Sequence, residues 1–220
     1  MDKADKIPMS SPLVSDELKK QMIPLFSKMT KNVNLKAILD YDDEKSIELG
    51  SFLKVIASCS DKIEIDFIEK DENMEIQEQL NGEHLPVVGI YGETYSGACF
   101  HGVPGGKEIN SFIAAICYKG GAANPLDKRV TKNIALIKKD ISIKIFVSLA
   151  CHHCPHVVAA CQKIAMENPY VTADMYDAKL YLDIIETYKV ERVPMMVINE
   201  SQKVMGQKTI EEIVNRLMNI

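Results

Sequence analysis

Two hydrophobic patterns alternate along this chain, and the order in which they follow one another occurs twice. Apolar residues at every second position, as in a half-buried strand, mark residues 63–68 in the first half and 171–176 in the second. Apolar residues at helical spacing mark the segments between and after such strands. The predicted strands are 32–41, 63–68, 85–91, 95–102, 141–148, 171–176, 193–198 and 203–206, and the predicted helices are 16–29, 44–57, 73–80, 107–118, 127–139, 152–166, 179–188 and 209–219.

The repeated order predicts two units of one fold. Each half runs strand, helix, strand, helix, strand, strand, helix, and a shift of 108 residues places Pro86 on Pro194. Strand–helix–strand connections favour parallel pairing, whereas the final hairpin is antiparallel, so the fold class is α/β with a mixed sheet flanked by helices in each unit. We place the units at residues 16–122 and 123–220, after a partly ordered leader over residues 1–15.

Composition narrows the class of protein. The 220 residues are 46% hydrophobic, with a net charge of -5 and both signs interspersed, so nucleic acid is not an expected partner. No apolar run approaches the roughly 20 residues of a membrane span, and the charged first residues show no secretory signal, so we expect no membrane contact and a cytoplasmic location. Four of the six cysteines are scattered and are interpreted as small buried hydrophobic residues: Cys59, Cys99, Cys117 and Cys161.

The other two cysteines lie where a predicted strand turns into a helix. Cys151 is expected near the helix N-cap, and Cys154 about one turn further along. Backbone N–H groups and the helix dipole favour a thiolate there, and a second cysteine three residues on can resolve a mixed disulfide. A Cys-x-x-Cys pair also occurs in structural zinc sites and as unreactive thiols. We expect no metal, because the chain has no second such pair and the neighbouring histidines cannot all converge on one ion.

Two further residues bear on this pair. Pro194 opens a strand 40 residues after Cys154, where thioredoxin-type folds place a cis proline against the disulfide; the alternative is an edge-strand proline with a trans bond. His153 lies between the cysteines. If protonated, it would stabilise the Cys151 thiolate and make the disulfide more oxidising; the alternative is a solvated residue at a helix start.

The first unit lacks a redox pair. A shift of 109 places Asp42 and Lys45 where the second unit has its two cysteines, so we expect this unit to keep a fold and a surface without a catalytic role. Glu108 follows a loop with two adjacent glycines and lies in the first turn of a predicted helix, where a carboxylate is favoured. On that ground alone it is a surface residue, although the loop is suited to close approach.

These residues resemble a known family. The run Ser148 to Pro155, the pair Val193-Pro194, and a Phe-x-Gly-x-Pro-x-Gly-x-Glu loop over residues 100–108 are similar to motifs in the N-terminal domain of the flavoprotein subunit of bacterial alkyl hydroperoxide reductase. The resemblance covers residues 18–220. It implies two tandem thioredoxin-like folds, of which only the second is redox-active, and a glutamate at position 108 that lies near the cysteines and influences their ionisation.

The resemblance also implies a function. In that family electrons pass from NADH through FAD and a flavin-domain dithiol to the cysteine pair, and then to an oxidised peroxiredoxin. This sequence has no Gly-x-Gly-x-x-Gly after a strand, so we expect it to bind neither flavin nor nicotinamide by that route and to carry no cofactor beyond its disulfide. We therefore expect a thiol–disulfide oxidoreductase that works between a thioredoxin-reductase-like flavoprotein and a peroxiredoxin.

Alternatives remain at this point. One is a general protein disulfide oxidoreductase, and another is a non-catalytic module whose cysteine pair holds a metal. The residue at His153 often differs in the family, which leaves the reduction potential open, and the sequence also leaves a homodimer open.

Overall fold

The computed structural model describes residues 3–220, and its elements follow the predicted order. A short 3-10 helix, η1 (Lys3–Lys6), precedes the first α-helix, and a second, η2 (Gly106–Glu108), precedes α4. The strands are β1 (Val33–Leu39), β2 (Ile63–Glu69), β3 (Val87–Tyr91), β4 (Tyr95–His101), β5 (Ile141–Val147), β6 (Val171–Asp177), β7 (Met195–Ile198) and β8 (Gln202–Met205). The α-helices are α1 (Asp16–Phe26), α2 (Glu44–Ala57), α3 (Met74–Gln79), α4 (Ile109–Lys119), α5 (Lys128–Ile134), α6 (Cys154–Glu167), α7 (Leu182–Tyr188) and α8 (Ile210–Leu217).

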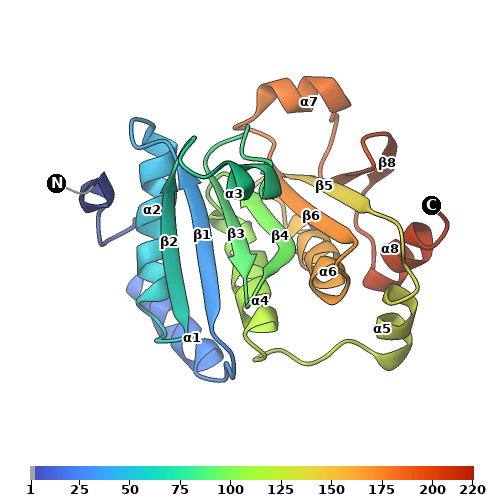
Figure 1. Ribbon diagram of the computed structural model, residues 1–220, viewed down its shortest axis with the longest axis horizontal. Coiled ribbons are helices and arrows are strands. Elements are labelled where there is room, and N and C mark those ends of the chain that lie inside the picture. The colour runs from blue at the N-terminus through green and yellow to red at the C-terminus, as the bar shows by residue number, and fades with distance from the viewer. Residues whose placement is uncertain (1–2) are drawn as a thin grey trace.

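All of these strands belong to one mixed sheet. Within residues 3–220 the sheet has eight strands in the order β2-β1-β3-β4-β6-β5-β7-β8, which cross the molecule from left to right in Figure 1. The order of the first four strands is repeated by the last four. The sequence predicted a mixed sheet in each unit, and the structure joins the two through parallel pairing of β4 with β6. This junction could not be foreseen from either half alone, because it pairs strands of different units.

The internal repeat extends to single hydrogen bonds. The peptide bonds before Pro86 and Pro194 are both cis. The carbonyl of Pro86 accepts from the amide of Gly102 at 2.8 Å, and the carbonyl of Pro194 accepts from Gly206 at 2.9 Å. The repeated strand order and these matching bonds are what a duplicated unit would produce, and the boundary between residues 122 and 123 stays a prediction.

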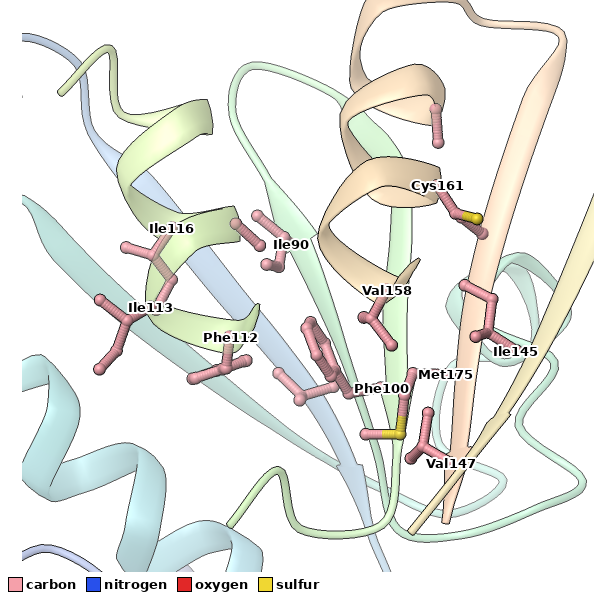
Figure 2. Packing of buried hydrophobic residues seen from close by; sticks show 14 of the residues in the cluster. Ile90, Phe100, Phe112, Ile113, Ile116, Ile145, Val147, Val158, Cys161 and Met175 are labelled. Carbon is pink, nitrogen blue, oxygen red and sulfur yellow. The ribbon is translucent and has the colours of Figure 1, made fainter. Parts of the chain in front are cut away.

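The two faces of the sheet are covered differently. On one face, helices α1, α2, α4, α5, α6 and α8 bury the main hydrophobic core. Part of this core is shown in Figure 2, where α4 and α6 pack over β3, β4, β5 and β6. On the other face the two short helices α3 and α7 cover smaller clusters. Side chains alternate between these faces along each strand. Phe100 therefore joins the main core, whereas its neighbours Cys99 and His101 lie on the face of α3 and α7.

The segment before α1 packs against the core, whereas the sequence predicted a partly ordered leader. Ile7 is only 2% exposed and belongs to the main core, where it fits over α2 because position 50 has no side chain. A Cβ at Gly50 would lie 2.8 Å from the Ile7 side chain. Val14 is buried as well. Short apolar anchors in a segment without periodicity carry no sequence signal, which is why they were missed. None of the helices within residues 3–220 has both the length and the apolar character needed to cross a membrane.

Candidate active site

The Cys-x-x-Cys segment connects β5 to α6. The strand ends at Val147, and a turn closed by a hydrogen bond from the Cys151 amide to the Ser148 carbonyl (2.8 Å) leads into the helix. The helix begins at Cys154 and its N-cap is His153, so the prediction of Cys151 near the N-cap was wrong by two residues. The later start follows from Pro155, which lies in the first helical turn, where a missing N–H costs nothing.

The two cysteines form a disulfide and differ in exposure. Their sulfur atoms are bonded, with the Cα atoms 5.6 Å apart, inside the range that disulfides normally span. Cys151 is partly exposed, whereas Cys154 is completely buried. The amide of Cys154, the first of α6, donates a hydrogen bond to the Cys151 sulfur at 3.2 Å. Once the disulfide is reduced, a donor and a helix N-terminus in this position favour negative charge on Cys151.

Pro194 lies at the edge of this site. The bond between Val193 and Pro194 is cis, as the sequence predicted, and the trans alternative is wrong. Strand β7 pairs antiparallel to β5 with Met195 opposite Phe146. Continuing this register by one residue brings the buried Pro194 beside Val147, at the end of the strand that leads to the cysteines. Val193, just before it, is half-buried.

Glu108 is buried, so its interpretation as a surface residue was wrong. The side chain is 0% exposed. One carboxyl oxygen accepts a hydrogen bond from the Ser111 hydroxyl, and the other has no partner among residues 3–220. Burial raises the pKa of Glu108 to about 7, although the Ser111 hydrogen bond lowers it, and the nearby carboxylate of Asp177 raises it further. Glu108 can therefore gain and lose a proton near neutral pH.

The loop that carries Glu108 touches the cysteine turn. The amide of Lys107 donates to the carbonyl of Leu149, two residues before Cys151, at 2.8 Å. Gly106 adopts φ +55°, and a Cβ there would clash with the same carbonyl oxygen. Only glycine permits this approach. A hydrogen bond from the first half of the chain thus supports the turn that carries the cysteine pair in the second half.

His153 is exposed and makes no side-chain capping hydrogen bond, although it is the N-cap residue of α6. This placement agrees with the solvated alternative. An effect of its charge on Cys151 remains a prediction.

The corresponding turn of the first half is shorter. Six residues separate β5 from α6, but four separate β1 from α2. A single shift of 109 therefore cannot match the two turns, and the residue at the helix start that corresponds to Cys154 is Glu44, not Lys45. Asp43 caps α2 by accepting from the Ser46 amide at 2.7 Å. Residues 40–45 contain no cysteine, so the expectation that this end of the first half carries no redox pair does not depend on the exact match.

A second group of reactive side chains carries no contiguous signal in the sequence. Cys99, His101 and Asp174 lie together on the face of α3 and α7, all buried, with their ligating atoms within 4.8 Å of one another. The interpretation of Cys99 as a small hydrophobic residue overlooked these neighbours. The available signal was the spacing of Cys99 and His101, which places both on one face of β4, together with an aspartate in the middle of β6.

Known proteins similar to this chain share the thioredoxin fold. A thioredoxin-domain family matches residues 141–219. The crystal structure of the N-terminal domain of alkyl hydroperoxide reductase AhpF from Enterococcus faecalis is 40% identical, with a TM-score of 0.88, over 92% of this chain and 99% of that one. A protein disulfide oxidoreductase from Aeropyrum pernix has the same fold at 18% identity, with a TM-score of 0.84, over 93% of this chain and 92% of that one.

Among curated proteins, the alkyl hydroperoxide reductase AhpF of Escherichia coli is 28% identical over 205 residues. That match covers 93% of this chain but 37% of the relative. The chain thus spans well under half the length of the curated relatives that it matches.

Proposed function

The chain belongs to the family of the N-terminal domain of the alkyl hydroperoxide reductase AhpF, and from that membership we propose that it carries electrons from a flavoprotein reductase to an oxidised peroxiredoxin. The observation that carries the proposal is the asymmetry of the cysteine pair. The accessible sulfur of Cys151 receives a hydrogen bond at the start of α6, and its partner Cys154 is buried directly behind it. This is the arrangement that thiol–disulfide exchange requires.

The exchange with peroxiredoxin proceeds in two steps. The Cys151 thiolate attacks one sulfur of the peroxiredoxin disulfide, forms a mixed disulfide, and releases the other peroxiredoxin sulfur as a thiolate. Cys154, after losing its proton, then attacks the Cys151 sulfur and releases the second peroxiredoxin thiolate. Two electrons pass to peroxiredoxin, its two thiolates take up protons from solvent, and the Cys151–Cys154 disulfide is restored. The flavoprotein closes the cycle by reducing this disulfide through its own dithiol.

Pro194 and Glu108 assist in different ways. We assign Pro194, which directly precedes β7 on the side of the cysteine turn, to alignment of the incoming peptide backbone. Glu108 serves as the buried acid–base group of the site, because its pKa of about 7 allows it to hold or release a proton during exchange. The hydrogen bond between Lys107 and Leu149 keeps the Glu108 loop against the cysteine turn.

A single-turnover experiment tests the proposal. The chain is reduced and freed of reductant, then mixed with an equimolar peroxiredoxin in its disulfide form, and the thiols of each protein are counted after rapid acid quenching. We expect the chain to lose two thiols as peroxiredoxin gains two, and Cys117→Ser, which changes a buried cysteine of α4, to behave like the parent.

Two further arms separate the alternatives. A flavoprotein reductase with NADH should reduce the oxidised chain, with one NADH consumed per disulfide. Reduction of insulin without transfer to peroxiredoxin would contradict the proposal in favour of a general disulfide reductase. Stoichiometric zinc bound by the cysteine pair after purification without reductant would contradict any redox role.

A further inference from the structure

The buried cluster of Cys99, His101 and Asp174 lies where β4 pairs with β6 in the sheet. Cys99 and Asp174 are direct neighbours in the parallel pairing of β4 with β6, the one strand pair that joins the first four strands to the last four. His101 follows on the same face of β4. The three side chains come from two units that are far apart in the sequence. Their polar ends meet beneath the loop between α3 and β3.

The distances within the cluster suit a tetrahedral metal ion. The Cys99 sulfur lies 3.5 Å from His101 Nε2 and 3.1 Å from one Asp174 oxygen. A zinc ion with bonds of about 2.3 Å to sulfur and about 2.1 Å to nitrogen or oxygen separates such ligand atoms by about 3.5 Å. The third pair of ligand atoms, from His101 and Asp174, lies within 4.8 Å, so rotation of the side chains would bring all three atoms to bonding distance of one ion.

The surrounding groups orient the three ligands. The Nδ1 atom of His101 lies 2.8 Å from the carbonyl of His84, which can only accept, so Nδ1 carries the proton and Nε2 presents its lone pair to the cluster. The second oxygen of Asp174 accepts a hydrogen bond from the Asn81 amide at 2.7 Å. Partners of this kind, which fix a histidine tautomer and hold a ligating carboxylate, are typical of metal sites.

A fourth polar group lies at the cluster. The hydroxyl of Tyr95 lies beside the Cys99 sulfur, is buried, and has no hydrogen-bond partner of good geometry among residues 3–220. A metal ion needs a fourth donor, and this hydroxyl can supply it or can hydrogen-bond a water bound to the ion.

A groove lies next to the cluster. A groove of about 680 Å³ runs between α3 and α7, and its lining includes Asn81, His84 and Tyr176. Asn81 and His84 are the residues that hold the ligands, and Tyr176 stacks on the His101 ring at 4.1 Å. The ammonium of Lys144, which also faces the groove, is neutralised by an ion pair with Glu200. A displacement of the loop around Asn81 would open the cluster to solvent.

We propose that Cys99, His101 and Asp174 form a binding site for a divalent transition-metal ion, with zinc favoured by the mixed sulfur, nitrogen and oxygen donors. This differs from the sequence-based expectation of no metal, and the site is separate from the Cys151–Cys154 pair, which lies at the turn between β5 and α6. The ion replaces the proton of the Cys99 thiol, which is released to solvent, and no electron is transferred. It would clamp β4 to β6 and so stabilise the junction of the two units.

Cobalt(II) is the probe for this site, because its thiolate complexes absorb strongly in the near ultraviolet. The full chain is used with its Cys151–Cys154 disulfide intact, so that the redox pair cannot supply thiolates. We expect one cobalt per chain, a sulfur-to-cobalt charge-transfer band, displacement of that band by one equivalent of zinc, and a higher thermal unfolding temperature with either metal. Absence of the band, or of any stabilisation by zinc, would overturn the proposal without affecting the proposed redox function.

Variants then locate the site. Cys99→Ala should abolish the band. Asn81→Gly, which removes the supporting side-chain hydrogen bond and suits the φ of +50° at this position, should weaken cobalt affinity by about 10- to 100-fold. Cys161→Ala removes a buried cysteine of α6 away from the cluster and should keep the band. A band that persists in Cys99→Ala would overturn the assignment. If Cys99→Ala fails to fold, the wild-type spectrum and the cobalt affinity of Asn81→Gly test the proposal instead.

Discussion

The buried carboxyl of Glu108 makes a quantitative prediction about stability. In the folded protein its pKa is raised from 4.5 to about 7, chiefly by burial. Between these two values the folded chain holds a proton that the unfolded chain has released. Stability therefore falls as the pH rises through this window, and the fall is complete above the folded pKa. One pKa unit corresponds to 1.36 kcal/mol, so ionisation of Glu108 in the folded protein lowers the free energy of unfolding by about 3 kcal/mol.

The substitution Glu108→Gln removes this titration and keeps the shape of the side chain. We expect the free energy of unfolding of the variant, relative to that of the parent, to increase by about 3 kcal/mol between pH 4.5 and pH 8. The measurement is urea denaturation of the oxidised proteins, followed by circular dichroism, at half-unit steps of pH. Glu44→Gln, which removes an exposed carboxylate from the first turn of α2, controls for the loss of one charge. Stability curves of Glu108→Gln and parent that run parallel across this range would refute the reasoning.

Three further predictions concern the redox turn. Cys151→Ser should abolish reduction of a peroxiredoxin disulfide, whereas Cys161→Ala should leave the rate within about twofold, as a stopped-flow thiol assay would show. Glu108→Gln should lower the pKa of the reduced Cys151, because a neighbouring carboxylate disfavours the thiolate. Iodoacetamide should therefore alkylate the variant faster below that pKa, and superimposable rate–pH profiles would contradict this. Gly106→Ala should lower the free energy of unfolding by about 1–3 kcal/mol and slow disulfide exchange, because its Cβ would clash with the Leu149 carbonyl and the residue has φ +55°. An unchanged melting temperature would show that the contact between the Gly106 loop and Leu149 is dispensable.

Local patterns predicted the elements of this fold well. The alternating residues Ile141, Ile143 and Ile145 lie on the face of their strand that is buried in the main core. Such a pattern can be recognised within the strand alone, without knowledge of its neighbours. The repeat was also visible, because Pro86 and Pro194 hold equivalent places in the two halves. The parallel pairing of β4 with β6 was not visible in the sequence, because nothing within one unit specifies which edge strand pairs with the other unit.

The same distinction applies to the sites. The Cys151–Cys154 pair is contiguous in the sequence, so its spacing was enough to indicate a disulfide-exchange site. Glu108 was ambiguous on local grounds, since its burial results from the approach of the Leu149 turn from the other half of the chain. The cluster of Cys99 and Asp174 depends on strand pairing between residues 75 positions apart and had no contiguous signal.

The central claim is that the Cys151 sulfur attacks the peroxiredoxin disulfide, and trapping the intermediate tests it most directly. Cys154→Ser cannot resolve a mixed disulfide, so mixing the reduced variant with oxidised peroxiredoxin should give a covalent 1:1 complex that a reductant dissolves. Peptide mass spectrometry of that complex should find one intermolecular disulfide, from Cys151 to a peroxiredoxin cysteine. A complex linked through Cys59 or another cysteine, or no complex under conditions in which the parent chain transfers two electrons, would contradict the account.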